Sequence, residues 1–470
     1  MNNIKVGIPL HGKMAARALH LPSFRDCLRA SSLQPVYFLS PHYFRSFDFD
    51  LGNYFELQTE QYNQHYGEHA FLRNLKMLRR FVVRTETTDL RFRETTENML
   101  FDESIPKIGW FLFLTDILRR IPNMGNLLQW METRFYPTHA HDHLLERQGI
   151  NCVLTPGMGN YNFWNEGSFA LEAQRLGLPA FAVITNYDNI VNMGFRGYTP
   201  TCLAVWSRQM ADEAMKLHGL PASKIEITGP VQYDRFMQPL PMERQAFLRS
   251  INLDPNWKTI FFAGGVNIIR YFEIYRLFVE QRERVWSEPF NLVVRPQPHI
   301  KLLGSPAWQV LEKQFCEAGV YVSNPGSIDA SGDRTEELRL DLAFEEGPDE
   351  LSYLLRYSDV MLNFFSTISL EAAICDLPAI HLGYDSFTFG QTFNTTTAFQ
   401  QRMTHNRRKL RLEASRVAKS ESELITFISQ YLGDRTLDWE ARRKYAISEC
   451  GELDGQAGVR LTEMIKSRMK

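Results

Sequence analysis

The segment from Ser366 to Glu371 carries residues well suited to bind a phosphate group. An apolar run typical of a buried strand ends there in two hydroxyl residues, Ser366 and Thr367, and a helical stretch follows. Free backbone N–H groups and the helix dipole at such a point favour an anion. Glu371 follows one turn later, within reach of a ribose or sugar hydroxyl. The same pattern also fits a Ser/Thr N-cap with a helical Glu that completes the cap and binds no ligand.

A second candidate segment ends the strand-like run at Val294. It places Arg295 before a proline-rich loop that carries His299. Arg295 can clamp a phosphate or carboxylate through two parallel hydrogen bonds. His299 can neutralise developing charge or protonate a leaving group. A surface salt bridge and a solvated loop histidine are the alternative.

Paired glycines, Gly264 and Gly265, mark a third predicted strand end, and Asn267 follows two residues later. Glycine lets a ligand approach the backbone closely because it has no side chain. An ordinary tight turn has the same composition. Together, the three segments predict an anion-binding site in the second half of the chain.

The first half of the chain holds candidates for a second site. Asp188, in a polar loop after a predicted strand, can act as a general base on a hydroxyl group or can simply form the turn. Glu166 follows another strand and is a rival base, with Trp164 placed to stack on a sugar. The loop His11-Gly12-Lys13, with Arg17, can hold acceptor or donor phosphate or form a plain turn.

Two patterns with metal-ligand residue types do not favour a metal site. His139, Asp142 and His143 lie close together in a helical segment, which is typical of a solvated helix end. The Asp-x-Asp string Asp48-Phe49-Asp50 is far in sequence from the predicted anion site. We expect no metal and no cofactor, because helix N-termini and cations can stabilise a diphosphate.

Strands and helices alternate in two blocks along the chain. Strand-like runs of the first block are residues 4–10, 35–39, 152–155, 179–185, 203–205 and 225–228. Those of the second block are residues 259–263, 291–294, 320–323, 360–364 and 379–382. Such alternation predicts two Rossmann-like, doubly wound domains. Ligands of such sheets bind beyond the carboxyl ends of the strands, so we expect the site in a cleft that the domains face.

A proline-punctuated linker divides the two blocks. We place the N-terminal domain at residues 1–238 and the C-terminal domain at 239–390. Within the first, residues 53–145 lose the strand signal and have apolar residues at helical spacing, which predicts a helical insertion. We expect residues 391–470 to be helices that pack back across the domains. Their basic run, 402–411, is typical of a solvated helix face.

Composition and targeting signals bound the class of protein. A net charge of −2 gives no reason to expect nucleic acid as a partner. Six cysteines without a CxxC pair fit reduced thiols. Since no signal peptide or membrane-spanning run is evident, we expect a cytoplasmic protein. The apolar stretch 108–121 is predicted as a buried helix, with peripheral contact at the inner membrane face as the alternative.

Several of these segments resemble motifs of the GT-B glycosyltransferases. Ser366 to Ala372, followed by Asp376-Leu377-Pro378, is similar to that group's Ser-Ser/Thr-x-x-x-Glu-Ala and Gly-x-Pro, with Asp376 where Gly is commoner. The segment Arg295 to His299 resembles the Arg-Pro-His-Pro strand end of capsule and teichoic-acid transferases, with Gln297 where the histidine usually stands. The loop from Thr185 to Gly194 resembles a Ser-Trp-Asp-Asn-Leu loop in related surface-polysaccharide proteins.

The resemblance implies a glycosyltransferase that uses a nucleotide-activated sugar in bacterial surface-polysaccharide or glycan biosynthesis. The donor would lie on the second domain, and a glycan or lipid-linked acceptor would enter from the first. The alternatives are a CDP-glycerol-type alditol-phosphate transferase, a UDP-sugar 2-epimerase and a non-catalytic binding protein of the same fold. The epimerases' Gly-Thr-Arg-Pro-Glu opening is replaced here by Gly7-Ile8-Pro9-Leu10-His11.

Overall fold

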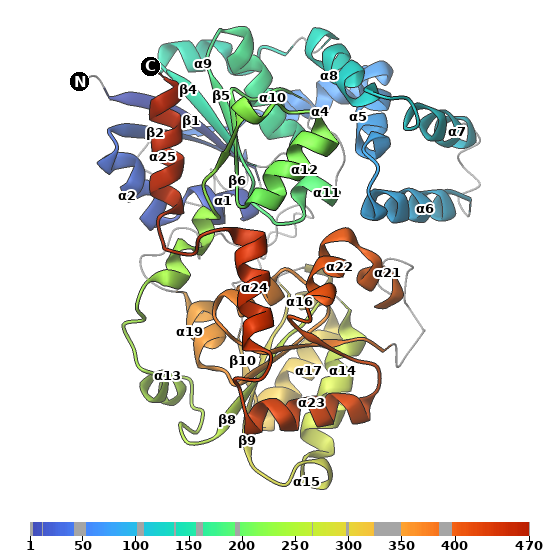
Figure 1. Cartoon of the computed structure of the whole chain (residues 1–470), viewed down its shortest axis with the longest axis vertical. Coiled ribbons are helices and arrows are strands. Elements are labelled where there is room, and N and C mark those ends of the chain that lie inside the picture. The colour runs from blue at the N-terminus through green and yellow to red at the C-terminus, as the bar shows by residue number, and fades with distance from the viewer. Residues whose placement is uncertain are drawn as a thin grey trace. The chain divides into compact units, whose positions relative to one another are not determined.

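The computed structural model describes residues 3–11, 13–41, 53–100, 108–135, 138–156, 163–192, 198–265, 267–297, 300–323, 349–384 and 397–469. The chain divides into two compact units (Figure 1). Unit 1 contains Met1–Asp234, Met403–His405 and Ser448–Lys470. Unit 2 contains Arg235–Arg402 and Asn406–Ile447.

Unit 1 is built on a seven-stranded parallel sheet with the order β3-β2-β1-β4-β5-β6-β7. Its strands are β1 (Ile4–Leu10), β2 (Leu33–Leu39), β3 (Tyr54–Glu56), β4 (Cys152–Pro156), β5 (Ala180–Val183), β6 (Cys202–Val205) and β7 (Ile225–Ile227). Strands β4, β5 and β6 are buried along their whole length, which is typical of a parallel sheet covered on both faces. The edge strand β3 corrects the prediction that residues 53–145 lack strands.

Helices outside the insertion pack on this sheet. They are α1 (Lys13–Leu19), α2 (Pro22–Ala30), α10 (Phe163–Arg175), α11 (Asn189–Asn192), α12 (Arg208–His218) and α25 (Ala457–Arg468). Helices α1 and α2 are separate because Pro22 begins α2. Ser207 caps α12, because its side chain accepts a hydrogen bond from the Met210 backbone N–H.

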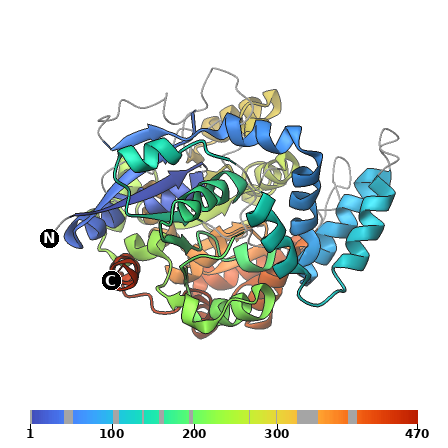
Figure 2. The same cartoon turned by 90° about the horizontal axis from the view of Figure 1, so that it is seen from above.

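The predicted helical insertion is present in unit 1. Its helices are α4 (Thr59–Glu68), α5 (Ala70–Val82), α6 (Glu86–Leu100), α7 (Ile108–Leu118), α8 (Met124–Phe135) and α9 (Asp142–Arg147). A small apolar core of Leu75, Val83, Met124 and Leu128 joins α5 to α8. Figures 1 and 2 both show α6 and α7 in the part of the insertion that lies far from the sheet of unit 1.

Unit 2 is built on a six-stranded parallel sheet with the order β10-β9-β8-β11-β12-β13. Its strands are β8 (Lys258–Ala263), β9 (Phe290–Arg295), β10 (Tyr321–Val322), β11 (Val360–Asn363), β12 (Ala379–Leu382) and β13 (Arg416–Ala418). Numbered within the unit, this is the order 3-2-1-4-5-6 of a Rossmann fold. Strand β13 corrects the prediction that residues 391–470 are helices alone.

The described helices after Arg235 complete the fold. They are α13 (Arg244–Ser250), α14 (Ile268–Tyr275), α15 (Arg282–Val285), α16 (Ile300–Leu303), α17 (Pro306–Glu317), α19 (Glu350–Tyr357), α20 (Ile368–Ile374), α21 (Thr397–Arg402), α22 (Thr404–Arg411), α23 (Glu421–Gly433) and α24 (Trp439–Cys450). The core of unit 2 packs the sheet residues Phe262 and Leu362 with Tyr271 of α14 and Trp308 of α17. Two Rossmann-like domains, as predicted, are therefore confirmed.

Candidate active site

The sheet of unit 2 has its topological switch point between β8 and β11. The chain leaves β8 toward β9 on one side, whereas β11 to β13 extend the sheet on the other. Ligands of open α/β sheets bind beyond the carboxyl ends of the strands at such a point. The loop with Gly264 and Gly265 follows β8, and the loop with Ser366 and Thr367 follows β11. We call these two loops, with the end of β9, the unit 2 crevice.

The two glycines of the unit 2 crevice have different roles. A Cβ atom on Gly264 would lie 2.2 Å from the Tyr271 hydroxyl oxygen, so only glycine fits there. Among the described residues, a Cβ atom on Gly265 would meet nothing closer than Gln297 Oε1, at 4.0 Å. Packing therefore accounts for Gly264, and the backbone at Gly265 is the part that a ligand can approach.

Tyr271 fixes the loops after β8 and β9 at the same time. Its buried hydroxyl donates to the Gly265 carbonyl at 2.8 Å and accepts from the Gln297 backbone N–H at 3.1 Å. Burial raises the pKa of this phenol, which therefore stays protonated and keeps donating. Asn267 caps α14, since its Oδ1 accepts from the Ile269 backbone N–H at 3.0 Å. That oxygen, predicted to bind donor, is thus used by the helix.

Asn363, at the end of β11, joins the loops after β8 and β11. It is fully buried, and its Nδ2 donates to the Ala263 carbonyl and to Ser366 Oγ, both at 2.8 Å. Its Oδ1 accepts from the Ser366 backbone N–H at 2.8 Å. The loop that carries Ser366 and Thr367 is therefore held before any ligand arrives. The sequence analysis missed Asn363, although it lies three residues before Ser366.

Phe365 has a backbone conformation that a side chain rarely adopts, with φ of 48°. Its ring is buried and stacks on His381 of β12, with ring centroids 4.5 Å apart. Its backbone N–H donates to His381 Nδ1 at 3.2 Å, so the imidazole proton is on Nε2. Burial lowers the pKa of His381 well below its ordinary range, and the ring is neutral. Strain of this kind persists only where the surroundings hold it.

Lys409 of α22 lies behind the Ser366 loop. Its side chain is buried, and its Nζ donates to Ser369 Oγ at 2.7 Å. Ser369 Oγ in turn donates to the Ser366 carbonyl at 2.8 Å. Lys409 corrects the prediction of a solvated basic run at 402–411, although Arg407 and Arg411 in that run are exposed. A buried ammonium group here favours an anion at the loop.

Arg295, at the end of β9, is buried in an ion-pair network. Its Nη1 donates to Ser323 Oγ at 2.5 Å and to Glu350 Oε2 at 3.2 Å. Burial lowers the pKa of Arg295, while the carboxylates of Glu350 and Glu371 act to raise it. The surface salt bridge considered from the sequence is therefore a buried one. Glu371 is half-buried one turn into α20, close enough for its charge to act on Arg295.

The remaining candidates for the donor site are Ser366, Thr367, Gln297 and His299. Ser366 and Thr367 are half-buried, and the Thr367 side chain makes no capping hydrogen bond to α20. Gln297 is exposed after β9. His299 lies outside the described residues.

The sheet of unit 1 has its own switch point, between β1 and β4. His11 follows β1, and its backbone N–H donates to Glu166 Oε1 at 3.3 Å. Burial lowers the pKa of the His11 imidazole to about 4, so the ring is neutral at pH 7. Its Nδ1 is buried without a hydrogen-bond partner among the described residues. Glu166, on α10, is fully buried.

The rest of the predicted acceptor loop is known in part. Arg17 is half-buried on α1. Lys13 begins α1, and its side chain is outside the described part of the structure. Gly12 lies outside it altogether, as does the side chain of Trp164.

Asp188 lies after β5 and immediately precedes the short helix α11. Its backbone carbonyl accepts from the Asn192 N–H at 2.9 Å, and its Oδ2 accepts from Asn192 Nδ2 at 2.7 Å. The Asp188 side chain is half-buried, unlike that of Glu166. The turn-forming role considered from the sequence is therefore present, and a carboxylate remains accessible beside it.

The polar cluster in the insertion is an ion-pair site. His139 Nδ1 and Asp142 Oδ2 are 2.6 Å apart, and Arg175 Nη2 donates to both carboxylate oxygens of Asp142 at 2.5 and 2.6 Å. Among the described residues, no group of three or more His, Cys, Asp or Glu side chains is arranged to hold a metal ion.

Comparison with known proteins finds no matching family model and no curated protein of similar sequence. Solved structures match in fold. A putative UDP-N-acetylglucosamine 2-epimerase from Listeria monocytogenes has a TM-score of 0.52 and 12% identity, covering 100% of this chain and 97% of its own. A UDP-GlcNAc 2-epimerase from Methanocaldococcus jannaschii has a TM-score of 0.51 and 11% identity, covering 99% and 100%.

A third structure is the UDP-GlcNAc 2-epimerase from Neisseria meningitidis bound to UDP-GlcNAc. It has a TM-score of 0.50 and 11% identity, covering 98% of this chain and 100% of its own. The likeness spans both units and concerns the fold. The resemblance stated from the sequence motifs is confirmed at that level: the chain has the GT-B fold, with two Rossmann-like domains.

Proposed function

We propose that the chain transfers a sugar from a nucleotide-activated donor to a hydroxyl group, and that the unit 2 crevice binds the donor. One observation carries the proposal. Buried side chains hold the two switch-point loops in place, Tyr271 from one side and Asn363 from the other. A site fixed before the ligand arrives loses little free energy to ordering when it binds.

The charges around this crevice suit a diphosphate leaving group. In transfer, the acceptor oxygen bonds to the anomeric carbon, and the bond from that carbon to the diphosphate breaks. The nucleoside diphosphate leaves with the electron pair. Fixed positive charge near those oxygens stabilises the transition state. Lys409 and Arg295 are buried cations of unit 2 that can supply such charge, so we propose a metal-independent reaction.

The acceptor hydroxyl must lose its proton, and unit 1 offers two carboxylates. Glu166 is fully buried and bonds to a backbone N–H. Asp188 is half-buried, which favours it as the base because a base must reach the bound substrate. Neutral His11, whose buried Nδ1 has no hydrogen-bond partner within the described part of the chain, is suited to hydrogen-bond a hydroxyl group.

A thermal-shift screen of UDP, GDP, CDP and CMP tests the donor site. A nucleotide at 100 times its Kd should stabilise the fold by about 2.7 kcal/mol. EDTA should leave the shift unchanged. If none of these nucleotides raises the Tm, the donor-site proposal is wrong, and a non-catalytic protein of this fold becomes the better account.

A UDP-sugar 2-epimerase is the second candidate, favoured by the solved structures that share the fold. Incubating the chain with UDP-GlcNAc and no acceptor separates the two activities. An epimerase forms UDP-ManNAc, visible by proton NMR, whereas a transferase leaves the sugar nucleotide unchanged until an acceptor is added. An alditol-phosphate transferase would instead consume a CDP-linked donor.

For the acceptor, we propose a lipid-linked molecule presented at a membrane surface. The support is helix α7, whose exposure is the reverse of an ordinary surface helix. Thr115 and Arg119 are buried, whereas Phe113 is 60% exposed and Leu114 is 47% exposed. The prediction of a buried apolar helix at 108–121 is therefore wrong for these side chains.

Helix α8 also exposes apolar side chains. It buries Met124 and Leu128 against α5, while Leu127 and Trp130 on its other face are 48% and 60% exposed. The apolar arm, as we call this surface, consists of Phe113, Leu114, Ile117, Ile121, Leu127, Trp130 and Phe135. Exposed apolar side chains gathered in this way mark an interaction site.

A lipid surface fits the apolar arm better than a bilayer-spanning role. Helix α7 has 11 residues, so it is about 16 Å long, half the thickness of a hydrocarbon core. None of the described helices is long and apolar enough to cross a membrane. Arg120 and Arg134 are exposed beside the arm, where anionic headgroups would lie.

Vesicle sedimentation tests the arm. We expect the chain to bind vesicles of phosphatidylcholine with phosphatidylglycerol, and a Phe113→Ser, Trp130→Ser double variant to bind about tenfold more weakly or worse. The matched control is Trp439→Ser, because Trp439 is 43% exposed outside the arm. Equal binding by both variants contradicts the proposal. Self-association without vesicles that the double variant abolishes would assign the arm to a second copy instead.

A further inference from the structure

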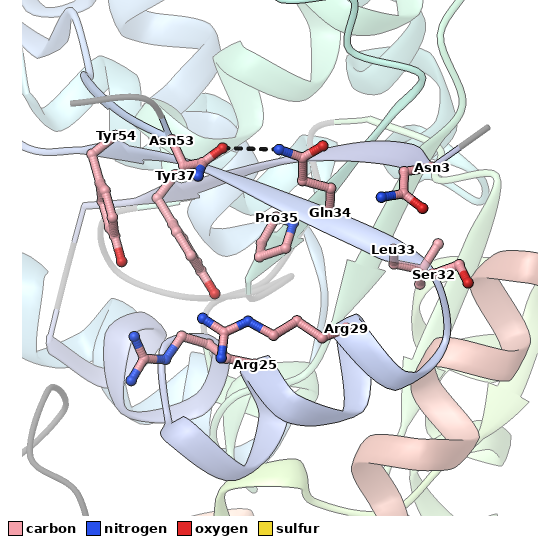
Figure 3. A pocket seen from close by; sticks show the side chains of 10 residues that line it. All are labelled: Asn3, Arg25, Arg29, Ser32, Leu33, Gln34, Pro35, Tyr37, Asn53 and Tyr54. Carbon is pink, nitrogen blue, oxygen red and sulfur yellow. Dashed lines mark hydrogen bonds between the residues drawn. The ribbon is translucent and has the colours of Figure 1, made fainter. Parts of the chain in front are cut away.

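A pocket of about 590 Å³ lies at the edge of unit 1, between α2 and the strands β2 and β3 (Figure 3). Small-molecule sites are roughly 300 to 1,000 Å³ in size. Its lining includes Asn3, Ser32 and Leu33, at the amino ends of β1 and β2. It is therefore at the opposite end of the strands from His11 and the switch point of this sheet.

Two arginines of α2 supply the charge of this pocket. Figure 3 shows the guanidinium groups of Arg25 and Arg29 reaching into the same space. None of the ten lining residues is Asp or Glu. Arg29 pairs with Asp26 at 3.3 Å, but both side chains are about 70% exposed, so the pair adds little. Among the described lining residues, the positive charge of the pocket therefore has no carboxylate against it.

The Arg25 side chain is also incompletely satisfied. Its Nε is buried and has no hydrogen-bond partner among the described residues. Buried donors in proteins are nearly always paired. Arg29 lies one turn further along the helix and adds a second positive charge. Like charges at this spacing oppose helix formation unless an anion neutralises them. An anion bound between them satisfies both requirements.

The wall across from α2 has two tyrosines. The rings of Tyr37 and Tyr54 stack with centroids 5.4 Å apart, and their hydroxyl groups point toward the arginines in Figure 3. Both hydroxyls are already anchored, Tyr37 to the Leu19 carbonyl and Tyr54 to His20. Above them, the amides of Gln34 and Asn53 bond to each other at 3.1 Å. The wall is therefore rigid and offers polar groups suited to sugar hydroxyls.

We propose that this pocket binds the phosphate group and ring of a sugar phosphate, as a site separate from the unit 2 crevice. Two guanidinium groups offer paired N–H donors with the geometry and charge of a phosphate. The ligand can be a free sugar phosphate or a sugar phosphate unit within a glycan chain.

Isothermal titration of the full chain with glucose 1-phosphate, in saturating UDP, tests this site. We expect the wild type to bind glucose 1-phosphate. The Arg25→Gln, Arg29→Gln double variant should bind it about tenfold more weakly or worse. The exposed Arg249→Gln serves as the matched control and should bind like the wild type. Arg29→Glu is a second variant, on an exposed side chain, and should also lose binding. Glucose alone should not bind.

The sources of the ligand are separated by comparing glucose 1-phosphate with its methyl phosphodiester. Tighter binding of the monoester assigns the pocket to a free metabolite, and tighter binding of the diester assigns it to a glycan segment. If the wild type binds neither compound, or if the arginine variants bind like the wild type, the proposal is wrong. Binding that UDP abolishes would place the ligand in the unit 2 crevice and also overturn it.

Discussion

The unit 2 crevice and the loops at the switch point of unit 1 occupy equivalent places on two parallel sheets, yet their chemistry differs. At β8 and β11, buried Asn363 and Tyr271 hold both loops, and the buried Lys409 lies behind the Ser366 loop, whereas Arg295 is paired with Glu350. At β1 and β4, the buried groups are the carboxyl group of Glu166 and a neutral histidine. The first arrangement suits an anion that must bind in one orientation, and the second suits a neutral hydroxyl group.

The difference shows that the fold alone does not decide which domain holds the donor nucleotide. Equivalent strand ends exist on both sheets, and loops at either could in principle cradle phosphate. Buried charge and the hydrogen bonds beneath each loop separate the two. Variants of these buried groups therefore test whether the two units differ in what they bind.

The largest effect is expected from Asn363→Leu, which leaves the Ala263 carbonyl and the Ser366 N–H without their partner. Each unpaired buried group costs about 1–3 kcal/mol, so we expect roughly 100-fold weaker UDP binding and a loss of about 3 kcal/mol in stability. Calorimetric titration and urea unfolding measure the two effects. The matched control in unit 1 is Asn192→Leu, and equal losses of UDP affinity in both would remove the contrast between the crevices.

The next effect is expected from Lys409→Met, which keeps the apolar stem and removes the buried charge. The removed charge acts on the diphosphate through space, so UDP binding should weaken by roughly tenfold or more. Arg407→Met, on the exposed side of the same helix, should have no effect. Identical UDP affinities for the wild type and the Lys409 variant would show that this ammonium group does not act on the site.

The strand ends at both switch points were predicted from the sequence. The buried side chains that support the loops there were not. Short apolar runs bounded by glycine, proline and hydroxyl residues predict strands well, because parallel strands are buried on both faces. Lys409 was not predicted to support the Ser366 loop, because it lies 40 residues beyond its partner Ser369 in a helix whose other residues are mostly polar. The three-residue edge strands β3 and β13 carry too few residues to show a periodic pattern.

The exposure of the side chains in the apolar run 108–121 was the other property that could not be predicted from the sequence. An apolar run such as 108–121 predicts a buried helix because most apolar runs are buried. Here Arg119 faces inward, where it bonds to Asp89, and the apolar side chains face outward. Only the packing of α7 against α5 decides which face is covered.

A third prediction concerns acid and the two histidines His11 and His381, whose pKa values burial lowers. The folded-state pKa of His11 is lowered to about 4 from 6.5, so the unfolded chain binds the proton more readily between these values. Stability is therefore lost as the pH falls through this window, and the effect from pH 7 to pH 5 is about 2 kcal/mol. His381 acts in the same direction. Urea unfolding at both pH values should show a smaller loss for His11→Gln, and an unchanged loss would contradict the lowered pKa.

The smallest effect is expected from Gly265→Ala. A methyl group there fits the protein but occupies space that a ligand phosphate would use, so UDP binding should weaken about fivefold with an unchanged Tm. Gly264→Ala provides the opposite pattern: the clash with Tyr271 should lower stability by about 1–3 kcal/mol. If Gly264→Ala is stable while Gly265→Ala unfolds, the roles given to the two glycines are reversed.

The most direct test of a donor site on unit 2 is a single calorimetric comparison of UDP binding to two variants of the full chain. Ser366→Ala, Thr367→Ala removes the hydroxyl groups of the unit 2 crevice, and His11→Phe, Asp188→Asn changes the polar groups of unit 1. We predict that the first variant loses most of its UDP affinity and that the second binds UDP like the wild type. Loss of UDP binding in the unit 1 variant, with the unit 2 variant unaffected, would contradict the assignment.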